Sequence, residues 1–222
     1  MARAPVLGQA KTRLADRVGT DQAADLAAAA LLDTLDAVES YADEGERLLM
    51  LTGELAVAAR GVEITDRLSR WQVTSQQGDT FAARLVHAHH EAASLWGSSH
   101  PVVQIGMDTP QLTADDLRAL SDLVGSGLDQ FDAALGPATD GGWWGLATRK
   151  AGYVDGLIDV RMSRSDTGRE TQRALQDAGA TVGLAPEVTD VDTLSDAVAV
   201  AELAPQTRFA RALTAMSLGA TR

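Results

Sequence analysis

The spacing of apolar and polar residues along the chain alternates between two periods, one typical of helices and one typical of strands. Apolar residues recur every three to four positions in five stretches, which predict helices at 20–42, 80–96, 113–124, 166–178 and 194–204. Short apolar runs, often with β-branched residues, predict strands in RLLMLT, WQVTSQ, PVVQIGMD, DAALGP and ATVGLA. A further amphipathic pattern, TRFARALTAMSLGATR, predicts a last helix. Because helices and strands alternate, we expect an α/β fold, a three-layer sandwich with a mostly parallel central sheet.

The length and composition favour one folded domain. The chain has 222 residues, of which 45% are hydrophobic, and it contains neither a Pro/Ser linker nor an internal repeat. We therefore expect a single domain over residues 1–222. No apolar run approaches the roughly 18 residues of a membrane span, and no apolar segment follows the basic residues at the start. Cysteine is absent, which excludes disulfides and thiol catalysis and fits a cytoplasmic protein.

The net charge of −12 argues against a nucleic-acid partner, because an acidic surface repels the phosphate backbone. The first seventeen residues reverse this balance, since they contain Arg3, Lys11, Arg13 and Arg17 against only Asp16. This local excess indicates a site for a small anion. A solvated loop and helix start would use the same basic residues equally well.

Five segments follow or join strand-like runs and contain the residues best suited to bind a ligand. In an open α/β sheet, ligands bind beyond the carboxyl ends of the strands. The segments are APVLGQAKTRL, SQQGDTFAARL, IGMDTPQL, GPATDGGWW and TDVDTLSD. Their glycines allow close backbone approach, and their carboxylates suit a hydroxyl or a metal ion.

Taken in this order, the five segments resemble the nucleotide-diphospho-sugar transferase superfamily, the GT-A glycosyltransferase fold. The nearest resemblance is to a bacterial group of glycosyltransferase-like proteins, and it spans almost the whole chain. Each motif alone is weak, but five motifs in one order at compatible spacing indicate this fold.

The resemblance implies a nucleotide-binding role for two of the segments. Lys11 and Arg13 would grip the donor's diphosphate, and Lys11 would also be catalytic. The complete set of implied nucleotide-binding residues is Ala4, Pro5, Gly8, Lys11, Arg13, Gln77, Gly78 and Arg84. For the last three, a turn followed by a surface helix is at least as plausible.

The resemblance also implies a metal site. Asp108 and Asp192 would bind Mg²⁺ or Mn²⁺ beside the diphosphate. Both carboxylates have a competing role as helix caps. Thr113 is a better cap than Asp108, whereas Asp190, Asp192 and Thr193 are all candidates to cap the helix that follows them.

The Asp-Gly-Gly element would hold the transferred sugar or the acceptor. Its implied residues are Asp140, Gly141, Gly142 and Trp143, with Asp140 catalytic as the group that orients or deprotonates the acceptor. Strand alternation would place one of Trp143 and Trp144 toward the site and the other in the core.

Three further features complete this picture. The histidines His87, His89 and His90 lack partners at metal-ligand spacing, so we expect them on a solvated helix surface. The chain departs from the family at Leu7, before Arg84, and in DVRMSRSDTGRE, where a Trp-Ser/Thr segment is usual. Only Met1, Ala2 and Arg3 precede the Ala-Pro loop, where the family has an apolar strand, so we expect the natural start to lie upstream.

Three classes of function are therefore open. The first is a metal-dependent glycosyltransferase that uses a nucleotide sugar and a small-molecule acceptor that the sequence does not identify. The second is a nucleotidyltransferase that uses a nucleoside triphosphate, because GQAKTRLADRVG also resembles the Lys-Ser-Arg-Leu-Ala loop of phospholactate guanylyltransferases. The third is a nucleotide or sugar sensor without turnover. The sequence does not predict the oligomeric state.

Overall fold

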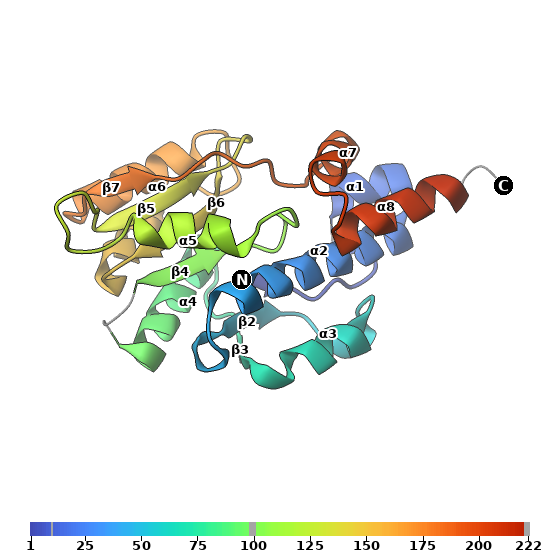
Figure 1. Cartoon of the computed structure of the whole chain (residues 1–222), viewed down its shortest axis with the longest axis horizontal. Helices are drawn as coiled ribbons and strands as arrows, with labels where there is room; N and C mark the ends of the chain where they lie inside the picture. The colour runs from blue at the N-terminus through green and yellow to red at the C-terminus, as the bar shows by residue number, and fades with distance from the viewer. Residues whose placement is uncertain (10, 98–100, 220–222) are drawn as a thin grey trace. The chain divides into compact units, whose positions relative to one another are not determined.

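The computed structural model describes residues 1–9, 11–97 and 101–219, and the chain forms two compact units (Figure 1). The three-stranded unit contains Ala2–Thr74, Met107–Thr113 and Asp190–Arg222. The four-stranded unit contains Met1, Ser75–Gly106 and Ala114–Thr189. Each unit therefore combines segments that are distant in the sequence. The single domain over residues 1–222 stays a prediction.

The three-stranded unit has the strand order β1-β2-β3, and β1 runs parallel to β2 with Ala2 opposite Leu51. Its strands are β1 (Ala2–Arg3), β2 (Leu48–Thr52) and β3 (Gln72–Ser75), the last residue of which belongs to the other unit. Its α-helices are α1 (Thr12–Val18), α2 (Thr20–Tyr41), α3 (Gly61–Arg67), α7 (Leu194–Leu203) and α8 (Arg208–Gly219). Three short 3₁₀ helices, η1 (Glu44–Glu46), η2 (Leu55–Val57) and η3 (Leu68–Arg70), connect them.

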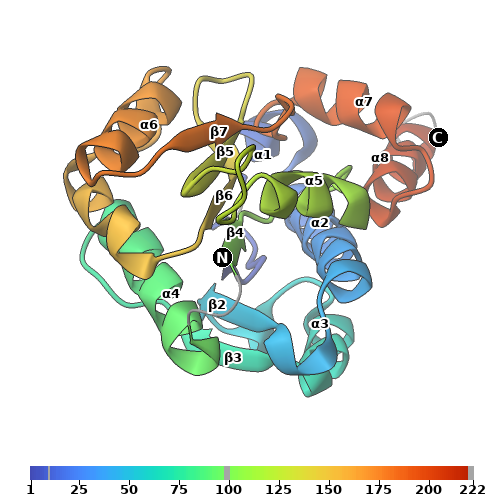
Figure 2. The same ribbon diagram turned by 60° about the vertical axis from the view of Figure 1, so that its left-hand side comes forward.

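Helix α2 is the centre of this unit because it is apolar on two faces. On one face Leu31 and Leu35 pack with Leu49 of β2 and Ile64 of α3. The opposite face packs against α1, α7 and α8 through a cluster that includes Leu14, Leu26, Val200 and Phe209. Figures 1 and 2 both show α1 and α8 beside α2. The segment AADLAAAALLDTL has few polar residues because both of these faces are buried, and its small alanine side chains let the neighbouring helices approach closely.

Acidic side chains of α2 fasten the surrounding helices to it. Asp33 accepts hydrogen bonds from the backbone N–H groups of Arg208 (2.9 Å) and Phe209 (2.8 Å), so it caps the start of α8. Arg67 of α3 forms ion pairs with Asp36 and Glu39. The Asp33 contacts position α8, which contributes Phe209 to the apolar cluster around Leu14, and the Arg67 ion pairs position α3.

The four-stranded unit has the strand order β4-β6-β5-β7. Its strands are β4 (Val102–Ile105), β5 (Ala133–Pro137), β6 (Trp143–Thr148) and β7 (Val182–Leu184). β6 is antiparallel to both β4 and β5, whereas β5 and β7 are parallel. Three of these four strands therefore run in one direction, and only β6, the second strand of a hairpin, is reversed. Two of the three pairings in this sheet are antiparallel, whereas β5 with β7 here and β1 with β2 in the other unit are parallel.

Helices cover this sheet and build its core. They are α4 (Phe81–Trp96), α5 (Ala114–Asp122), α6 (Thr167–Asp177) and the 3₁₀ helix η4 (Ala151–Asp159). Leu135 and Leu146 of the sheet pack with Leu157 of η4 and Leu175 of α6. Figures 1 and 2 both show α6 beside β7. Throughout the described residues, no helix has the length and apolar character needed to cross a membrane.

The predicted strands and helices are all found, and the structure adds elements that were not predicted. All five predicted strands exist, as β2, β3, β4, β5 and β7, and the six predicted helices exist as α2 and α4 to α8. The strands β1 and β6 and the helices α1 and α3 were not predicted. The residues that precede these two helices, Lys11 (φ 47°) and Arg60 (φ 51°), adopt left-handed backbone conformations and provide no side-chain cap. The helix starts therefore lack the usual sequence signal.

The expectation that all three clustered histidines are solvated was wrong for His89. Its side chain is fully buried on the inner face of α4, 2.8 Å from the hydroxyl of Thr148 and 3.2 Å from the amide oxygen of Gln104. Burial lowers the pKa of His89 to about 4, although the Gln104 contact opposes this shift. The signal was present in the sequence, because Leu85 and His89 are four residues apart and share one helix face.

Candidate functional site

Three residues that are distant in the sequence meet in the three-stranded unit. The ammonium of Lys11 lies 3.6 Å from the Asp108 carboxylate and 3.7 Å from the Asp192 carboxylate. It also donates a hydrogen bond to the backbone carbonyl of Val191. Arg13 joins the group, with a guanidinium nitrogen 3.2 Å from Asp192. We refer to Lys11, Arg13, Asp108 and Asp192 as the Lys11 cluster.

The backbone at Lys11 and one long-range backbone hydrogen bond explain this convergence. Lys11 adopts a left-handed conformation directly before α1, and Leu14 anchors α1 in the core. The backbone N–H of Val191 donates to the carbonyl of Asp108 (2.8 Å), which ties the loop after β4 to the segment before α7. The two carboxylates are thereby brought to the same ammonium.

Neither carboxylate acts as a helix cap. α7 is capped by Thr193, whose hydroxyl and backbone form a reciprocal capping box with Asp196. The Asp192 carboxylate faces Lys11 and Arg13 instead. α5 begins at Ala114, too far along the chain for Asp108 to cap it, and the Asp108 carboxylate also faces Lys11. Helix capping, the alternative role that the sequence allowed, is therefore excluded for Asp108 and Asp192.

The Lys11 cluster is open on its carboxylate side. The Lys11 side chain is 13% exposed, whereas the side chains of Asp108 and Asp192 are each 42% exposed. The separations of 3.6 Å and 3.7 Å exceed ordinary hydrogen-bond lengths, so the ammonium attracts both carboxylates without saturating them. The neighbouring Thr109 hydroxyl is buried and has no hydrogen-bond partner among the described residues.

The donor set fits a metal ion that is bound together with a phosphate ligand. Within the part of the chain that the structure describes, no group of three or more His, Asp or Glu side chains is arranged to hold a metal. Asp108 and Asp192 provide two partly exposed carboxylates that face the same ammonium. Mg²⁺ is commonly held by one or two carboxylates, with phosphate oxygens and waters completing the shell.

The other predicted residues of the first loop belong mainly to the fold. Ala4 and Pro5 are buried, and the backbone N–H of Ala4 donates to the carbonyl of Thr52 (2.8 Å). The carbonyl of Pro5 accepts from the N–H of Ala59 (3.0 Å). Gly8 is exposed with φ 72°, so it is the residue of these three that is open to a ligand.

The second predicted nucleotide-binding segment, which contains Gln77, Gly78 and Arg84, forms a helix start in the four-stranded unit. The hydroxyl of Thr80 caps α4 by accepting from the N–H of Ala83 (3.1 Å). Gly78 has φ 125°, and a Cβ there would lie 2.8 Å from the Cβ of Ala83. The Arg84 side chain donates back to the Gly78 carbonyl (3.0 Å). These contacts match the turn and surface helix that the sequence also allowed, and a nucleotide role for Gln77, Gly78 and Arg84 stays a prediction.

The Asp140 turn connects β5 to β6 in the same unit. One carboxylate oxygen of Asp140 accepts from the backbone N–H of Gly142 (2.7 Å). The residue is exposed, and its second oxygen accepts no hydrogen bond from the described residues. Gly141 has φ 88°, and a Cβ there would lie 2.1 Å from the Ser165 carbonyl oxygen. The glycine therefore admits a neighbouring backbone segment, not open space for a ligand.

The two tryptophans after this turn differ in their availability. A register shift between Gly136 and Pro137 leaves Trp144 as an extra residue in β6, which changes the simple alternation. Trp144 is 3% exposed, and its indole N–H donates to the Pro186 carbonyl (3.0 Å), so it is a core residue. Trp143 is half-buried, and its indole N–H donates to the Thr171 hydroxyl (3.2 Å).

A comparison with solved structures supports the fold. The chain resembles the crystal structure of a protein from Desulfovibrio desulfuricans G20 named a "putative nucleotide-diphospho-sugar transferase". The two sequences are 25% identical, the match covers 97% of this chain and 92% of the other, and the TM-score is 0.79. The α/β fold of nucleotide-diphospho-sugar transferases, expected from the five motifs, is thereby confirmed. Among curated proteins, none matches the chain.

A comparison with protein families identifies the family of this chain. Residues 34–164, more than half of the chain, match a family described as uncharacterised proteins conserved in bacteria, DUF2064. The matched stretch includes Asp108 and the Asp140 turn, but neither Lys11 nor Asp192. The protein is a member of the DUF2064 family and has the fold of nucleotide-diphospho-sugar transferases.

Proposed function

We propose that this protein is a metal-dependent glycosyltransferase that takes a sugar from a nucleotide-diphospho-sugar. The observation that supports this proposal is the convergence of Asp108 and Asp192 on the Lys11 ammonium, at 3.6 Å and 3.7 Å. The fold similarity to the Desulfovibrio protein supports the same general kind of transferase.

In this proposal the Lys11 cluster binds the diphosphate of the donor. Asp108 and Asp192 would hold Mg²⁺ or Mn²⁺, which offsets negative charge on the departing nucleoside diphosphate. Lys11 and Arg13 would donate charge-assisted hydrogen bonds to phosphate oxygens. Arg13 is 76% exposed and able to reach a ligand, whereas Lys11 must turn part of its ammonium away from the two carboxylates.

Asp140 is the proposed residue for the acceptor. Its exposed second oxygen is suited to orient an acceptor hydroxyl and to take up its proton as the hydroxyl attacks the anomeric carbon. The other carboxylate oxygen is held by Gly142, which limits the rotation of the group. The half-buried Trp143 would offer part of one aromatic face to a sugar ring.

One observation favours a second function, a nucleotidyltransferase. The sugar-transferase proposal needs an aromatic face for the sugar ring, but Trp144 is a buried core residue and Trp143 is half-buried, so little aromatic surface is available. A nucleotidyltransferase would use the same Lys11 cluster and release pyrophosphate from a nucleoside triphosphate.

The decisive experiment asks which bond is cleaved. The full chain would be incubated with a panel of nucleotide sugars, Mg²⁺ or Mn²⁺, and no acceptor, and release of nucleoside diphosphate would be measured. We expect slow metal-dependent hydrolysis that is lost in Asp108→Asn, while the melting temperature of that variant stays nearly unchanged. Asp115→Asn is the matched control, because Asp115 is an exposed carboxylate on α5.

Two results would redirect the proposal. Pyrophosphate release from a nucleoside triphosphate and a phosphorylated acceptor, without cleavage of any nucleotide sugar, would establish the second function. Metal-dependent nucleotide binding without either product would indicate a sensor.

A further inference from the structure

The loop before α6 and the first turn of that helix contain three arginines that converge on one carboxylate. Arg164 Nε lies 3.1 Å from Asp166, and terminal nitrogens of Arg161 and Arg169 each lie 3.8 Å from it. Arg161 also forms an ion pair with Glu170. We refer to residues 161–170 as the arginine loop.

The arginine loop has a defined internal structure. The hydroxyl of Thr167, which is buried, donates to the Arg161 carbonyl (2.9 Å) and accepts from the Arg164 N–H (3.0 Å). Ser163 has φ 59°, a left-handed conformation that is uncommon for a residue other than glycine. The loop therefore presents its arginines from a constrained backbone, and such constraint is often found at binding sites.

The loop lies directly against the Asp140 turn. The backbone N–H of Gly168 donates to the Gly141 carbonyl (2.8 Å). A Cβ on Gly168 would lie 2.6 Å from the carbonyl oxygen of Gly142, and one on Gly141 would lie 2.1 Å from the carbonyl oxygen of Ser165. Both contacts leave no room for side chains, so glycine is required on each side of this junction.

The loop also has unused hydrogen-bond donors. It contains three arginines against Asp166 and Glu170, which leaves one positive charge in excess in a chain of net charge −12. Among the described residues, the terminal nitrogens of Arg164 and the side-chain N–H groups of Arg169 make no hydrogen bond. Both side chains are more than half exposed. The contact between Arg169 and Asp166 is 3.8 Å, which is too long for a hydrogen bond. Arg169 therefore does not hold the loop together through a hydrogen bond to Asp166.

We propose that Arg164 and Arg169 form a binding site for a phosphate group, and that the acceptor of this transferase therefore carries a phosphate. Phosphate suits this arrangement because guanidinium groups present several N–H donors in a planar fork that matches its oxygens. Calling the ligand an acceptor rests on the proposed function and on the adjacent Asp140 turn. The binding of phosphate itself does not depend on that function.

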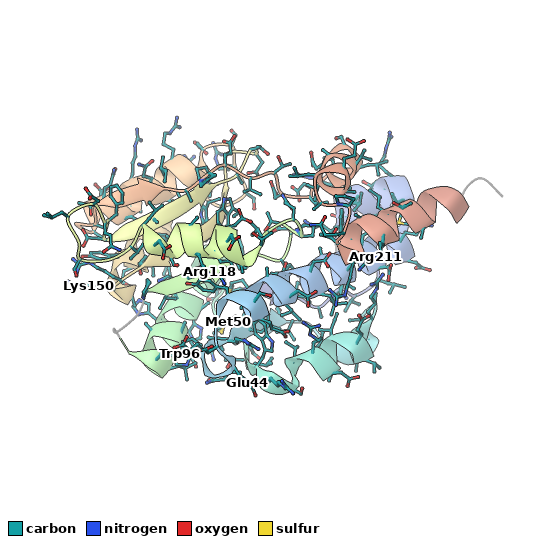
Figure 3. The ribbon with its side chains drawn as sticks, viewed as in Figure 1. Glu44, Met50, Trp96, Arg118, Lys150 and Arg211 are labelled. Atoms are coloured by element: carbon teal, nitrogen blue, oxygen red, sulfur yellow. The ribbon has the colours of Figure 1, made fainter. Side chains whose placement is uncertain are left out.

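The experiment measures the binding of inorganic phosphate to the full chain by calorimetry. The double variant Arg164→Gln, Arg169→Gln should bind phosphate at least roughly tenfold more weakly than the wild type, because each arginine provides charge-assisted hydrogen bonds. Arg118→Gln is the matched control, since Arg118 is an exposed arginine on α5 of the same unit (Figure 3). It should bind phosphate like the wild type.

A second variant separates this site from the proposed donor site. Lys11→Gln should weaken the binding of a nucleoside diphosphate but keep the phosphate binding that depends on Arg164 and Arg169. The double arginine variant should show the opposite pattern. If the wild type binds no nucleotide, the proposed function fails, but the phosphate measurements still test the arginine site.

Chemical protection tests the site without a variant. Inorganic phosphate should protect Arg164 and Arg169, but not Arg118, from modification by phenylglyoxal, as mapped by mass spectrometry of peptides. The proposal is overturned if the wild type binds no phosphate, if the double variant binds it unchanged, or if binding is lost only in Lys11→Gln. Acetate that protects as well as phosphate would also overturn it, since the site would then not select phosphate.

Discussion

Two carboxylate sites of the molecule lie beside basic side chains but differ in how many hydrogen bonds the protein donates to them. One site is Asp132, and the other is the pair Asp108 and Asp192. Asp132 accepts from the backbone N–H (2.9 Å) and hydroxyl (2.8 Å) of Thr181 and from Arg149 Nε (2.7 Å). A terminal nitrogen of Arg149 and the Tyr153 hydroxyl (3.2 Å) add a fourth and a fifth donor. The hydrogen bond from the Thr181 backbone, with those from its hydroxyl and from Arg149, holds the pKa of Asp132 far below its usual value.

The Lys11 cluster is the opposite case. Its two carboxylates share one ammonium at 3.6 Å and 3.7 Å, and both remain 42% exposed, against 16% for the side chain of Asp132. An ionised carboxylate has about four lone-pair positions to satisfy. At Asp132 the protein itself fills these positions, so the residue joins β5 to the segment before β7. At Asp108 and Asp192 positions stay open, which is what a ligand-binding carboxylate requires.

The largest effect on stability should come from removing Asp132, which we call the closed site because the protein fills its acceptor positions. Asp132→Ala should lower the free energy of unfolding by about 3 kcal/mol, because it removes five hydrogen bonds and leaves Arg149 without its partner. Urea unfolding would measure this, with nucleotide binding unchanged. Asp115→Ala is the control, an exposed carboxylate whose loss should cost less than about 1 kcal/mol. Equal losses in the two variants would contradict the distinction between closed and open sites.

A second closed network should give a pH-dependent stability. The folded protein keeps His89 neutral, with a pKa of about 4, whereas an unfolded chain takes up a proton below about 6.5. Stability from this residue is therefore complete above about pH 6.5 and is lost as the pH falls toward 4. The protonation of His89 should lower the free energy of unfolding by roughly 3 kcal/mol in total.

Unfolding by urea at pH 7 and pH 4.5 would test this prediction for His89. The fall in stability between the two pH values should shrink in His89→Gln and persist in His90→Gln, because His90 is a partly exposed neighbour on α4. An unchanged fall in His89→Gln would show that other groups cause it.

The smallest effect on stability, but a specific effect on binding, is expected at the open site. Lys11→Ala should weaken the binding of a nucleoside diphosphate by about 1.5 to 3 kcal/mol, while an uncharged nucleoside binds as before. Arg17→Ala, at the end of α1, is the basic control and should leave both affinities unchanged. Calorimetry would measure both ligands. Equal losses for the diphosphate and the nucleoside would mean that Lys11 acts through folding of the loop.

Local signals were enough for most of the fold. The long amphipathic helices and the apolar strands were predictable because burial imposes a period of 3.6 or 2 residues on the chain itself. Thr193 was one of three cap candidates before α7, and its capping box with Asp196 decided among them. Helices α1 and α3 escaped prediction because each follows a left-handed residue without a side-chain cap.

The sequence by itself determined the α/β fold, the order of the five motifs and the residue types available for chemistry. Only the tertiary structure decided how those residues are used: that Asp108 and Asp192 share Lys11, that His89 is buried, and that Ser165 occupies the space beside Gly141. The physical reason is that periodicity and capping act between residues within a few positions of each other. Whether a carboxylate is saturated or open depends instead on partners that lie many residues away and meet only in the folded chain.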